Sequence, residues 1–227
     1  MTFFQHQAQI INISIGALIG LFLWLIYLTF SYGLADIFAE KANYEMQLWE
    51  NQEVALDTWN STQTTLQRAL QFEPQNPDLL EMMGKIYDWK AKRSFSLPEQ
   101  IFAHQRALDY FLKAAKKRPI SALTWANILL LKNALFQYDA QFSMALEQTI
   151  LQAPWHPFVH RVVVYVGLSA WQHLSENGQF LVLIATERGL GGKEAKQIEN
   201  IIQQSQHKQT ICKYSQQSQE LLNFCLN

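Results

Sequence analysis

The sequence predicts an all-α protein, in which one N-terminal helix crosses a membrane and the rest of the chain forms a stack of helical hairpins. A run of apolar residues at 13–35, without a charged side chain, predicts the membrane helix. Beyond this run, apolar residues recur with helical spacing, and no clear stretch alternates between apolar and polar residues as a half-buried strand does. Pro74, Pro119 and Pro154 each follow an amphipathic segment, which indicates a recurring helical unit.

The segment at 13–35 has roughly the length that a helix needs to cross the ~30 Å hydrocarbon layer of a bilayer. A cleaved signal peptide is the alternative, but it needs a basic start and an apolar core of about 7–15 residues. The short tail at 1–12 begins with nine residues that include no Lys or Arg, and the apolar run is longer than such a core. We therefore expect an uncleaved single-pass anchor, whose orientation the mixed charges of Asp36, Glu40 and Lys41 do not set.

Charge and length exclude other classes of protein. The chain has 227 residues, with 18 Lys and Arg against 19 Asp and Glu, and its net charge is −1. Because no basic field would release counterions from phosphates, we expect no nucleic-acid partner. The length suits one domain with an appendage. We therefore divide the chain beyond the membrane helix into a helical-repeat domain at 36–190 and a capping segment at 191–227.

The helical domain is expected to consist of helices with short connections, so that neighbours pack antiparallel. The first of these helices continues the membrane helix out of the bilayer. The expected helices span 36–56, 58–72, 77–93, 98–117, 121–136, 139–152, 157–174, 178–189 and 193–207.

The residues around Pro74 and Pro119 match the tetratricopeptide repeat, a helical hairpin with a period of about 34 residues. An insertion of about eleven residues lengthens the turn inside this unit, and a degenerate second unit ends at Pro154. We therefore predict a right-handed stack of about three or four hairpins, with a plain helical bundle as the alternative. The expected packing residues of the first unit are Leu80, Met83, Gly84, Tyr87, Ala107, Phe111, Ala114 and Pro119.

In such a stack, the first helix of each hairpin lines a concave groove. An aromatic ring beside hydrogen-bonding groups suits a peptide segment or a sugar ring, and a merely solvated helix face is the alternative. We expect most tryptophans, Trp125 and Trp155 among them, to pack within the hairpins. The candidate groove residues are Asp78, Glu81, Lys85, Asp88 and Trp89.

Metal binding and catalysis find little support in the sequence. His156 and His160 have the spacing of two metal ligands on one helix, but no glutamate completes an HExxH pattern, and Pro157 favours a turn at His156. The glycines at 189–192 lack the strand and the Ser or Thr of a phosphate loop, so we expect a helix end with a left-handed glycine there. We expect no metal, no cofactor and no catalytic residue.

Cys212 and Cys225 lie in the polar C-terminal segment and are candidates for a disulfide. Closing a loop of ~15 residues stabilises a chain by about 3 kcal/mol on the chain-entropy model, and disulfides persist in oxidising compartments. The spacing matches no redox or zinc pattern, and two unrelated thiols are the alternative.

Several stretches of the chain occur together in one protein family. They are YGLADIFAEKA at the end of the membrane helix, LQRALQFEPQNPDLLEMMGKIYDWKA, ALDYFLKAAKKRPISALTWANILLLK, APWHPFVHRVV and the late cysteine pair. Over most of its length the chain resembles the VpsP-like proteins of exopolysaccharide biosynthesis. This resemblance implies a bacterial inner-membrane anchor with a periplasmic helical-repeat domain that organises polysaccharide synthesis and export, and it implies no catalytic residues.

We therefore expect a non-enzymatic scaffold that binds protein components of an exopolysaccharide machinery, or its glycan, beside the inner membrane. A membrane-bound tetratricopeptide scaffold for cytochrome maturation or pilus assembly is the main alternative. A glycan-modifying enzyme is a further alternative, which no pattern of nucleophile, base and orienting residue favours.

Overall fold

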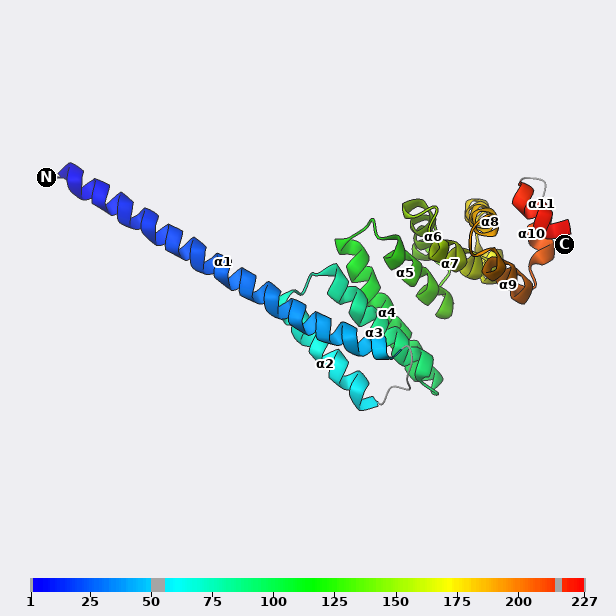
Figure 1. Ribbon diagram of the computed structural model, residues 1–227, viewed down its shortest axis with the longest axis horizontal. Coiled ribbons are helices and arrows are strands. Elements are labelled where there is room, and N and C mark those ends of the chain that lie inside the picture. The colour runs from blue at the N-terminus through cyan, green and yellow to red at the C-terminus, as the bar shows by residue number, and fades with distance from the viewer. Residues whose placement is uncertain (1, 50–55, 215–217, 227) are drawn as a thin grey trace. The chain divides into compact units, whose positions relative to one another are not determined.

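The structure of the protein, a computed structural model, describes residues 2–49, 56–214 and 218–226. Every regular element within these residues is helical, so the predicted all-α class is confirmed for this part of the chain. The chain divides into two units, Met1–Leu79 and Leu80–Asn227. Figure 1 labels the helices in the order of the chain.

The first unit contains a helix that is long and apolar enough to cross a membrane. Helix α1 (Thr2–Leu48) runs for 47 residues without a break (Figure 1). At about 1.5 Å per residue this is ~70 Å, more than the ~30 Å of a bilayer core. The expected continuation of the membrane helix beyond Ala35 is therefore confirmed, but α1 ends at Leu48 rather than near 56. Residues 50–55 lie outside the described part of the chain.

Beyond its most apolar part, α1 packs against helix α2 (Leu56–Phe72). Ala35 and Ala42 are fully buried on α1, and small side chains two turns apart let a neighbouring helix approach closely. Phe38 of α1 stacks on Phe72 of α2, with ring centroids 6.2 Å apart. The second half of α1 is thus one arm of a helical hairpin.

The second unit begins within α3 (Pro77–Arg93), a helix that starts in the first unit. The expected helix at 157–174 is divided into α7 and a short 3₁₀ helix, η1, and the short helices α10 and α11 were not expected. The remaining elements are α4 (Leu97–Lys117), α5 (Ala122–Ala134), α6 (Ala140–Gln152), α7 (Pro157–Ser169), η1 (Trp171–His173), α8 (Glu176–Leu190), α9 (Ala195–Ser205), α10 (Lys208–Cys212) and α11 (Gln219–Leu226).

Two successive hairpins of the second unit pack against each other helix by helix. Helix α5 packs against α6, and α7 packs against α8. The first helices of the two hairpins, α5 and α7, also contact each other, as do the second helices, α6 and α8. Helix α4 packs against α5 in turn. The α5–α6 hairpin therefore covers the α7–α8 hairpin with both of its helices.

Glycines let paired helices approach closely in this unit. A Cβ atom added at Gly84 in α3 would lie 2.6 Å from Cε2 of Phe111 in α4, and the Phe111 side chain is 1% exposed. A Cβ atom added at Gly167 in α7 would overlap Val182 of α8 in the same way. Gly84 and Gly167 thus mark places where a larger residue would push two helices apart.

Three connections share one design, in which proline is the second of four residues. They are the turns at 73–76, 118–121 and 153–156, which join α2 to α3, α4 to α5 and α6 to α7. We call them the proline turns. In each turn the last N–H donates to the first carbonyl: Asn76 to Glu73 (3.2 Å), Ser121 to Arg118 (3.3 Å) and His156 to Ala153 (3.1 Å).

Helix α5 ends earlier than the expected 136 because its C-terminus closes in a Schellman turn. The N–H of Gln137 donates to the carbonyl of Lys132 (2.9 Å), and the N–H of Phe136 donates to that of Asn133 (3.1 Å). Phe136 adopts the left-handed conformation, with φ 55. Its side chain is 81% exposed, so this strained position contributes little to the core.

A buried lysine ties the end of α5 to the start of α6. The Lys132 side chain is 2% exposed, and its Nζ donates to both carboxylate oxygens of Asp139, at 2.9 and 2.8 Å. Asp139 is also the N-cap of α6, where it accepts from the N–H of Phe142 (2.9 Å). The hydrogen bond from Lys132 holds the pKa of Asp139 below its usual value.

A disulfide joins Cys212 of α10 to Cys225 of α11, with their Cα atoms 5.7 Å apart. Helix α11 also packs against α8 and α10, and it buries Leu221 and Phe224. The disulfide and these apolar contacts hold the C-terminal helix against the last hairpin.

Candidate functional site

Two of the expected groove residues use their carboxylates inside the protein. Glu81 of α3 accepts hydrogen bonds from Nη2 of Arg118 (2.7 Å) and from the hydroxyl of Thr124 (2.5 Å). These bonds link α3 to a proline turn and to the first turn of α5. Glu81 therefore helps to join helices of the second unit.

Asp88 has a similar environment further along α3. It accepts a hydrogen bond from Nζ of Lys92 (2.5 Å), and its other oxygen lies 3.6 Å from Nδ1 of His104 in α4. Burial raises the pKa of Asp88, but the neighbouring His104 and Lys92 side chains outweigh burial and lower it below its usual value. The carboxylate is therefore expected to be ionised at neutral pH.

The other expected groove residues differ in their exposure. Trp89 is partly exposed, and the guanidinium of Arg93 lies 4.2 Å from the centroid of its ring. Lys85 is exposed one turn before Trp89. Asp78 is exposed in the first turn of α3, in the part of the helix that belongs to the first unit. The groove itself stays a prediction.

The expected packing residues of the first repeat are buried, with one exception. The exception is Pro119, which is exposed within its turn. The buried residues are Leu80, Met83, Gly84, Tyr87, Ala107, Phe111 and Ala114.

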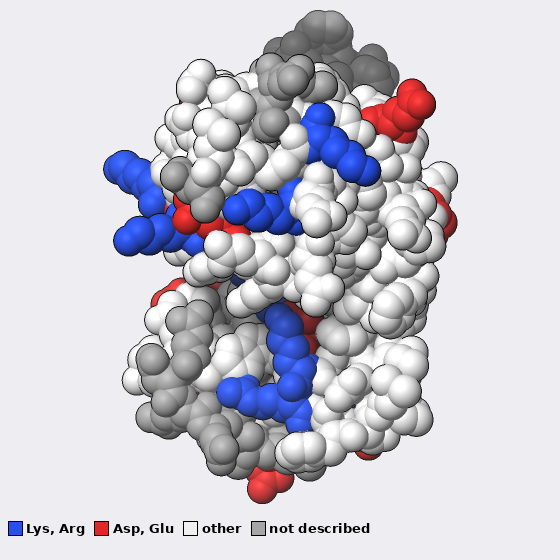
Figure 2. Space-filling model, turned by 90° about the vertical axis from the view of Figure 1, so that its right-hand side faces the viewer, with Lys and Arg blue, Asp and Glu red and all other residues white. Residues whose placement is uncertain are grey.

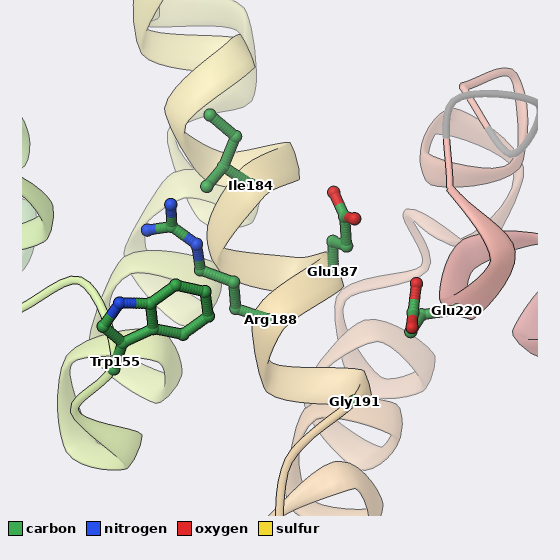
Figure 3. Close-up of a pocket in the computed structure, with 6 residues that line it drawn as sticks. All are labelled: Trp155, Ile184, Glu187, Arg188, Gly191 and Glu220. Carbon is green, nitrogen blue, oxygen red and sulfur yellow. The ribbon is translucent and has the colours of Figure 1, made fainter.

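A pocket near the other end of the second unit was not expected from the sequence. It has a volume of about 470 Å³, and its floor is one face of α8, where Ile184, Glu187, Arg188 and Gly191 follow each other at helical spacing. Figure 3 shows Arg188 reaching from α8 over Trp155, and Glu220 on the far side. We call this the Trp155 pocket; its six lining residues are Trp155, Ile184, Glu187, Arg188, Gly191 and Glu220.

Trp155 is the most exposed tryptophan among the described residues, with 74% of its surface accessible. The expectation that it packs within a hairpin is therefore wrong. It lies in the third proline turn, and the Arg188 guanidinium lies 4.6 Å from the centroid of its ring. Arg188 also donates to the carbonyl of Pro154 (3.1 Å), the residue before Trp155.

His160 holds the same carbonyl. Its Nε2 lies 2.9 Å from the oxygen of Pro154, and six positions after Pro119 the indole nitrogen of Trp125 donates to the Pro119 carbonyl in the same way (2.7 Å). His160 therefore fixes a turn. His156 is exposed, and no three His, Cys, Asp or Glu side chains lie together as a metal site within the described residues.

The glycines at the end of α8 do not form the expected left-handed turn, so that expectation is wrong. No glycine in the described chain has positive φ, and Gly191 has φ −76. A Cβ atom at Gly189 would lie 2.7 Å from Cγ1 of Ile198 in α9, and one at Gly191 would lie 3.4 Å from Cγ of Glu220. Gly189 therefore lets α9 come close to the end of α8, whereas a Cβ atom at Gly191 would make only an ordinary contact with Glu220.

Charges around this end of the molecule are mixed. On the face shown in Figure 2, basic and acidic side chains are interspersed among uncharged ones. Arg161 of α7 pairs with Glu194 (2.5 Å). This pair lies beside a second hollow of about 290 Å³, which shares Trp155, Arg188 and Gly191 with the Trp155 pocket. The face in Figure 2 therefore offers no broad field of one sign that would select a polyanion or a polycation.

The sequence held one signal for this site. The position after proline is Gln75 in the first proline turn, Ile120 in the second and Trp155 in the third. All three side chains are exposed, so an aromatic residue at this position is not needed by the turn. The approach of Glu220 could not be foreseen, because it depends on how α11 packs.

The chain was compared with models of protein families and with curated proteins, and it matches none of them. The residues that bear on function are therefore those of the chain itself: the long apolar helix, the proline turns and the Trp155 pocket. They are the basis of the proposal that follows.

Proposed function

We propose that the protein is a membrane-anchored helical-repeat scaffold that binds protein components of a bacterial exopolysaccharide machinery. In this proposal α1 is a single-pass anchor in the inner membrane, and the second unit is a right-handed stack of tetratricopeptide-like hairpins in the periplasm. The recurrence of the proline turn, together with the stacking of the α5–α6 hairpin on the α7–α8 hairpin, is the observation that carries the proposal.

The backbone of the proline turns supports the repeat. The residue before proline has φ −135 and ψ 75 at Arg118, and φ −143 and ψ 66 at Ala153. The residue that precedes the next helix is extended in both turns, at Ser121 and at His156. Repeated backbone geometry between α4, α5, α6 and α7 is what stacked copies of one hairpin require.

The compartment is supported by the disulfide and by the anchor. Disulfides form and persist in oxidising environments such as the bacterial periplasm and are rare in the cytosol, and Cys212 and Cys225 are joined here. Helix α1 is long and apolar enough for a single membrane span. The link to exopolysaccharide depends on the resemblance of the sequence to the VpsP-like proteins.

Alkaline phosphatase fused after residue 227 tests the topology. The enzyme needs an oxidising compartment, so we expect the fusion to be active in a bacterial host and a cytoplasmic reporter at the same place to be inactive. The reverse pair of results would contradict the periplasmic placement.

The scaffold role is tested by altering one exposed face of α3. Lys85 and Trp89 lie one turn apart, so the double variant Lys85→Glu, Trp89→Ala changes this face. In a bacterium from which the gene has been deleted, we expect the wild-type chain to restore polysaccharide secretion and chemical cross-linking to envelope proteins. The double variant should reach the membrane but lose both.

Met144→Ala is the matched control, because Met144 is an exposed residue of α6, a second helix of its hairpin. We expect this variant to behave like the wild type. If deletion of the gene leaves polysaccharide secretion unchanged, the exopolysaccharide role is wrong. If the double variant retains every cross-link, the groove on α3 is wrong.

A further inference from the structure

We propose that the Trp155 pocket binds a neutral sugar ring, which packs its apolar face against Trp155 and hydrogen-bonds to the charged groups around it. This inference goes beyond the proposed function, since it concerns a different part of the second unit from the groove on α3. It depends on the geometry of the pocket and not on which machinery the scaffold serves.

The fold itself does not require Trp155. The proline turns place Gln75 and Ile120 at the same position with the same backbone hydrogen bond. Ile120 is 73% exposed and Trp155 is 74% exposed, so neither side chain contributes much buried area. The indole is therefore available for recognition, and tryptophan is enriched among the residues that carry most of the energy in binding interfaces.

Trp155 is held ready for a ligand. Both His160 and Arg188 contact the carbonyl of Pro154, at 2.9 and 3.1 Å, and Arg188 stacks against the indole. These contacts fix the turn and one side of the ring while the rest of the ring stays open. A side chain that is already ordered loses less conformational entropy when a ligand binds.

The polar groups of the pocket match hydroxyl groups. Glu187 and Glu220 offer only hydrogen-bond acceptors when ionised, and Arg188 offers only donors. Glu220 accepts one hydrogen bond, from Ser218 (3.1 Å). A hydroxyl both donates and accepts, so a ring that carries several hydroxyls can satisfy the carboxylates and the guanidinium together.

Charged ligands fit this arrangement less well. A cationic group that approached the indole would meet the guanidinium of Arg188, and an anionic group would meet Glu187 and Glu220. Basic and acidic side chains are also interspersed on the face shown in Figure 2. The ligand that suits the pocket is therefore uncharged, with a flat apolar face and polar edges.

The dimensions of the pocket agree with this ligand. Its volume of about 470 Å³ falls in the range of about 300–1,000 Å³ that small-molecule sites occupy. Ile184 adds an apolar side chain to the floor, and the absence of a side chain at Gly191 leaves room beside Glu220. Figure 3 shows Trp155 and Glu220 on opposite sides of α8, with Arg188 projecting from the helix toward Trp155 and Glu187 projecting on the side of Glu220.

The experiment measures binding of neutral tetrasaccharides of glucose, galactose and mannose to the full chain by isothermal titration calorimetry. The protein is reconstituted in lipid nanodiscs, because the sugar headgroups of maltoside detergents would compete. Tetragalacturonate and a chitosan tetramer provide the anionic and cationic comparisons. We expect at least one neutral tetrasaccharide to bind more tightly than either charged one.

Trp155→Gln is the decisive variant, because it introduces the residue that the first proline turn carries at this position. We expect it to fold, as shown by an unchanged circular dichroism spectrum, and to bind the neutral sugar about tenfold more weakly or worse. Ile120→Gln is the matched control and should leave the affinity unchanged. The proposal is overturned if none of the neutral sugars binds, if a charged tetrasaccharide binds more tightly, or if Trp155→Gln and Ile120→Gln bind with equal affinity.

A second variant tests whether Glu220, on the side of the pocket away from Trp155, contacts the sugar. Glu220→Gln should weaken binding several-fold, and reduction of the disulfide should weaken the wild type similarly, because Glu220 lies in the loop that Cys212 and Cys225 close. Reduction should have little further effect on Glu220→Gln. If reduction weakens Glu220→Gln as much as the wild type, Glu220 is not part of the site. The Lys85 and Trp89 variant tests the scaffold independently, and it should bind sugar normally.

Discussion

Gly84→Ala is predicted to destabilise the protein although alanine is the better helix former. In an exposed helix, this change would stabilise by about 1 kcal/mol. At Gly84 the new Cβ would lie 2.6 and 2.7 Å from Cε2 and Cδ2 of Phe111, a ring that is 1% exposed. Overpacking of this kind costs about 1–3 kcal/mol, so the net effect is expected to be a loss of up to about 2 kcal/mol.

Coupling to Phe111 tests whether the clash is the cause. Leucine at 111 lacks the ring edge that faces Gly84, so Gly84→Ala should cost less in a Phe111→Leu background, with a coupling energy of about 1 kcal/mol. The assay is urea unfolding of the full chain in micelles, followed by circular dichroism. Each variant is compared with the wild type by its midpoint and slope.

Gly178→Ala is the matched control. A Cβ atom at Gly178 of α8 would lie no closer than 3.4 Å to its neighbours, which is an ordinary contact, so we expect no loss of stability or a small gain. If the effect of Gly84→Ala is the same in the wild-type and the Phe111→Leu backgrounds, the close approach of α3 and α4 at this point is refuted.

Three further predictions concern the ends of helices. Phe136→Gly should raise the thermal midpoint, because glycine avoids a left-handed strain of about 1–2 kcal/mol and little buried area is lost; an unchanged or lower midpoint would argue against that strain. The hydrogen bond from Lys132 lowers the pKa of Asp139, so the ionised carboxylate stabilises the fold above the ordinary value of 3.8, and this stability is lost as the pH falls below that value. Asp139→Asn should therefore make the thermal midpoint less dependent on pH in acid. Midpoints of the variant and the wild type that fall in parallel with pH would argue against the ion pair of Lys132 and Asp139. Replacing Cys212 and Cys225 by serine should remove about 3 kcal/mol of local stability from the C-terminal helices. Amide hydrogen exchange should become faster in α10 and α11 and stay unchanged in α5. If exchange in α11 is as slow as in the wild type, its apolar contacts are sufficient to hold this helix in place.

The helices were largely predictable because their signals are local. The sequence places Pro77 and Pro157 at the first position of a helix, where a missing N–H costs nothing, and both helices start there. The helix expected at 139–152 began at Asp139, and this residue is the N-cap of α6. Proline spacing likewise located the three turns. Each of these signals acts within about one helical turn, where the sequence alone determines which groups can meet.

The contacts at the candidate sites were less predictable because they join residues that are far apart in the chain. Glu81 was expected to face a groove, yet it bonds to Arg118 and Thr124, which come from a later turn and helix. The sequence does not show that these donors approach α3. Glu220 reaches the Trp155 pocket only because α11 packs on α8. Whether a carboxylate is paired or open therefore depends on tertiary packing.

Each proline turn has an exposed position after proline at which different side chains are accommodated. The residue after proline points outward in each turn while its backbone stays the same, so its identity can change without a change in how the helices pack. Gln75, Ile120 and Trp155 show that a polar, an aliphatic and an aromatic side chain are all accommodated. Exchanging single residues could therefore move a recognition element from one proline turn to another.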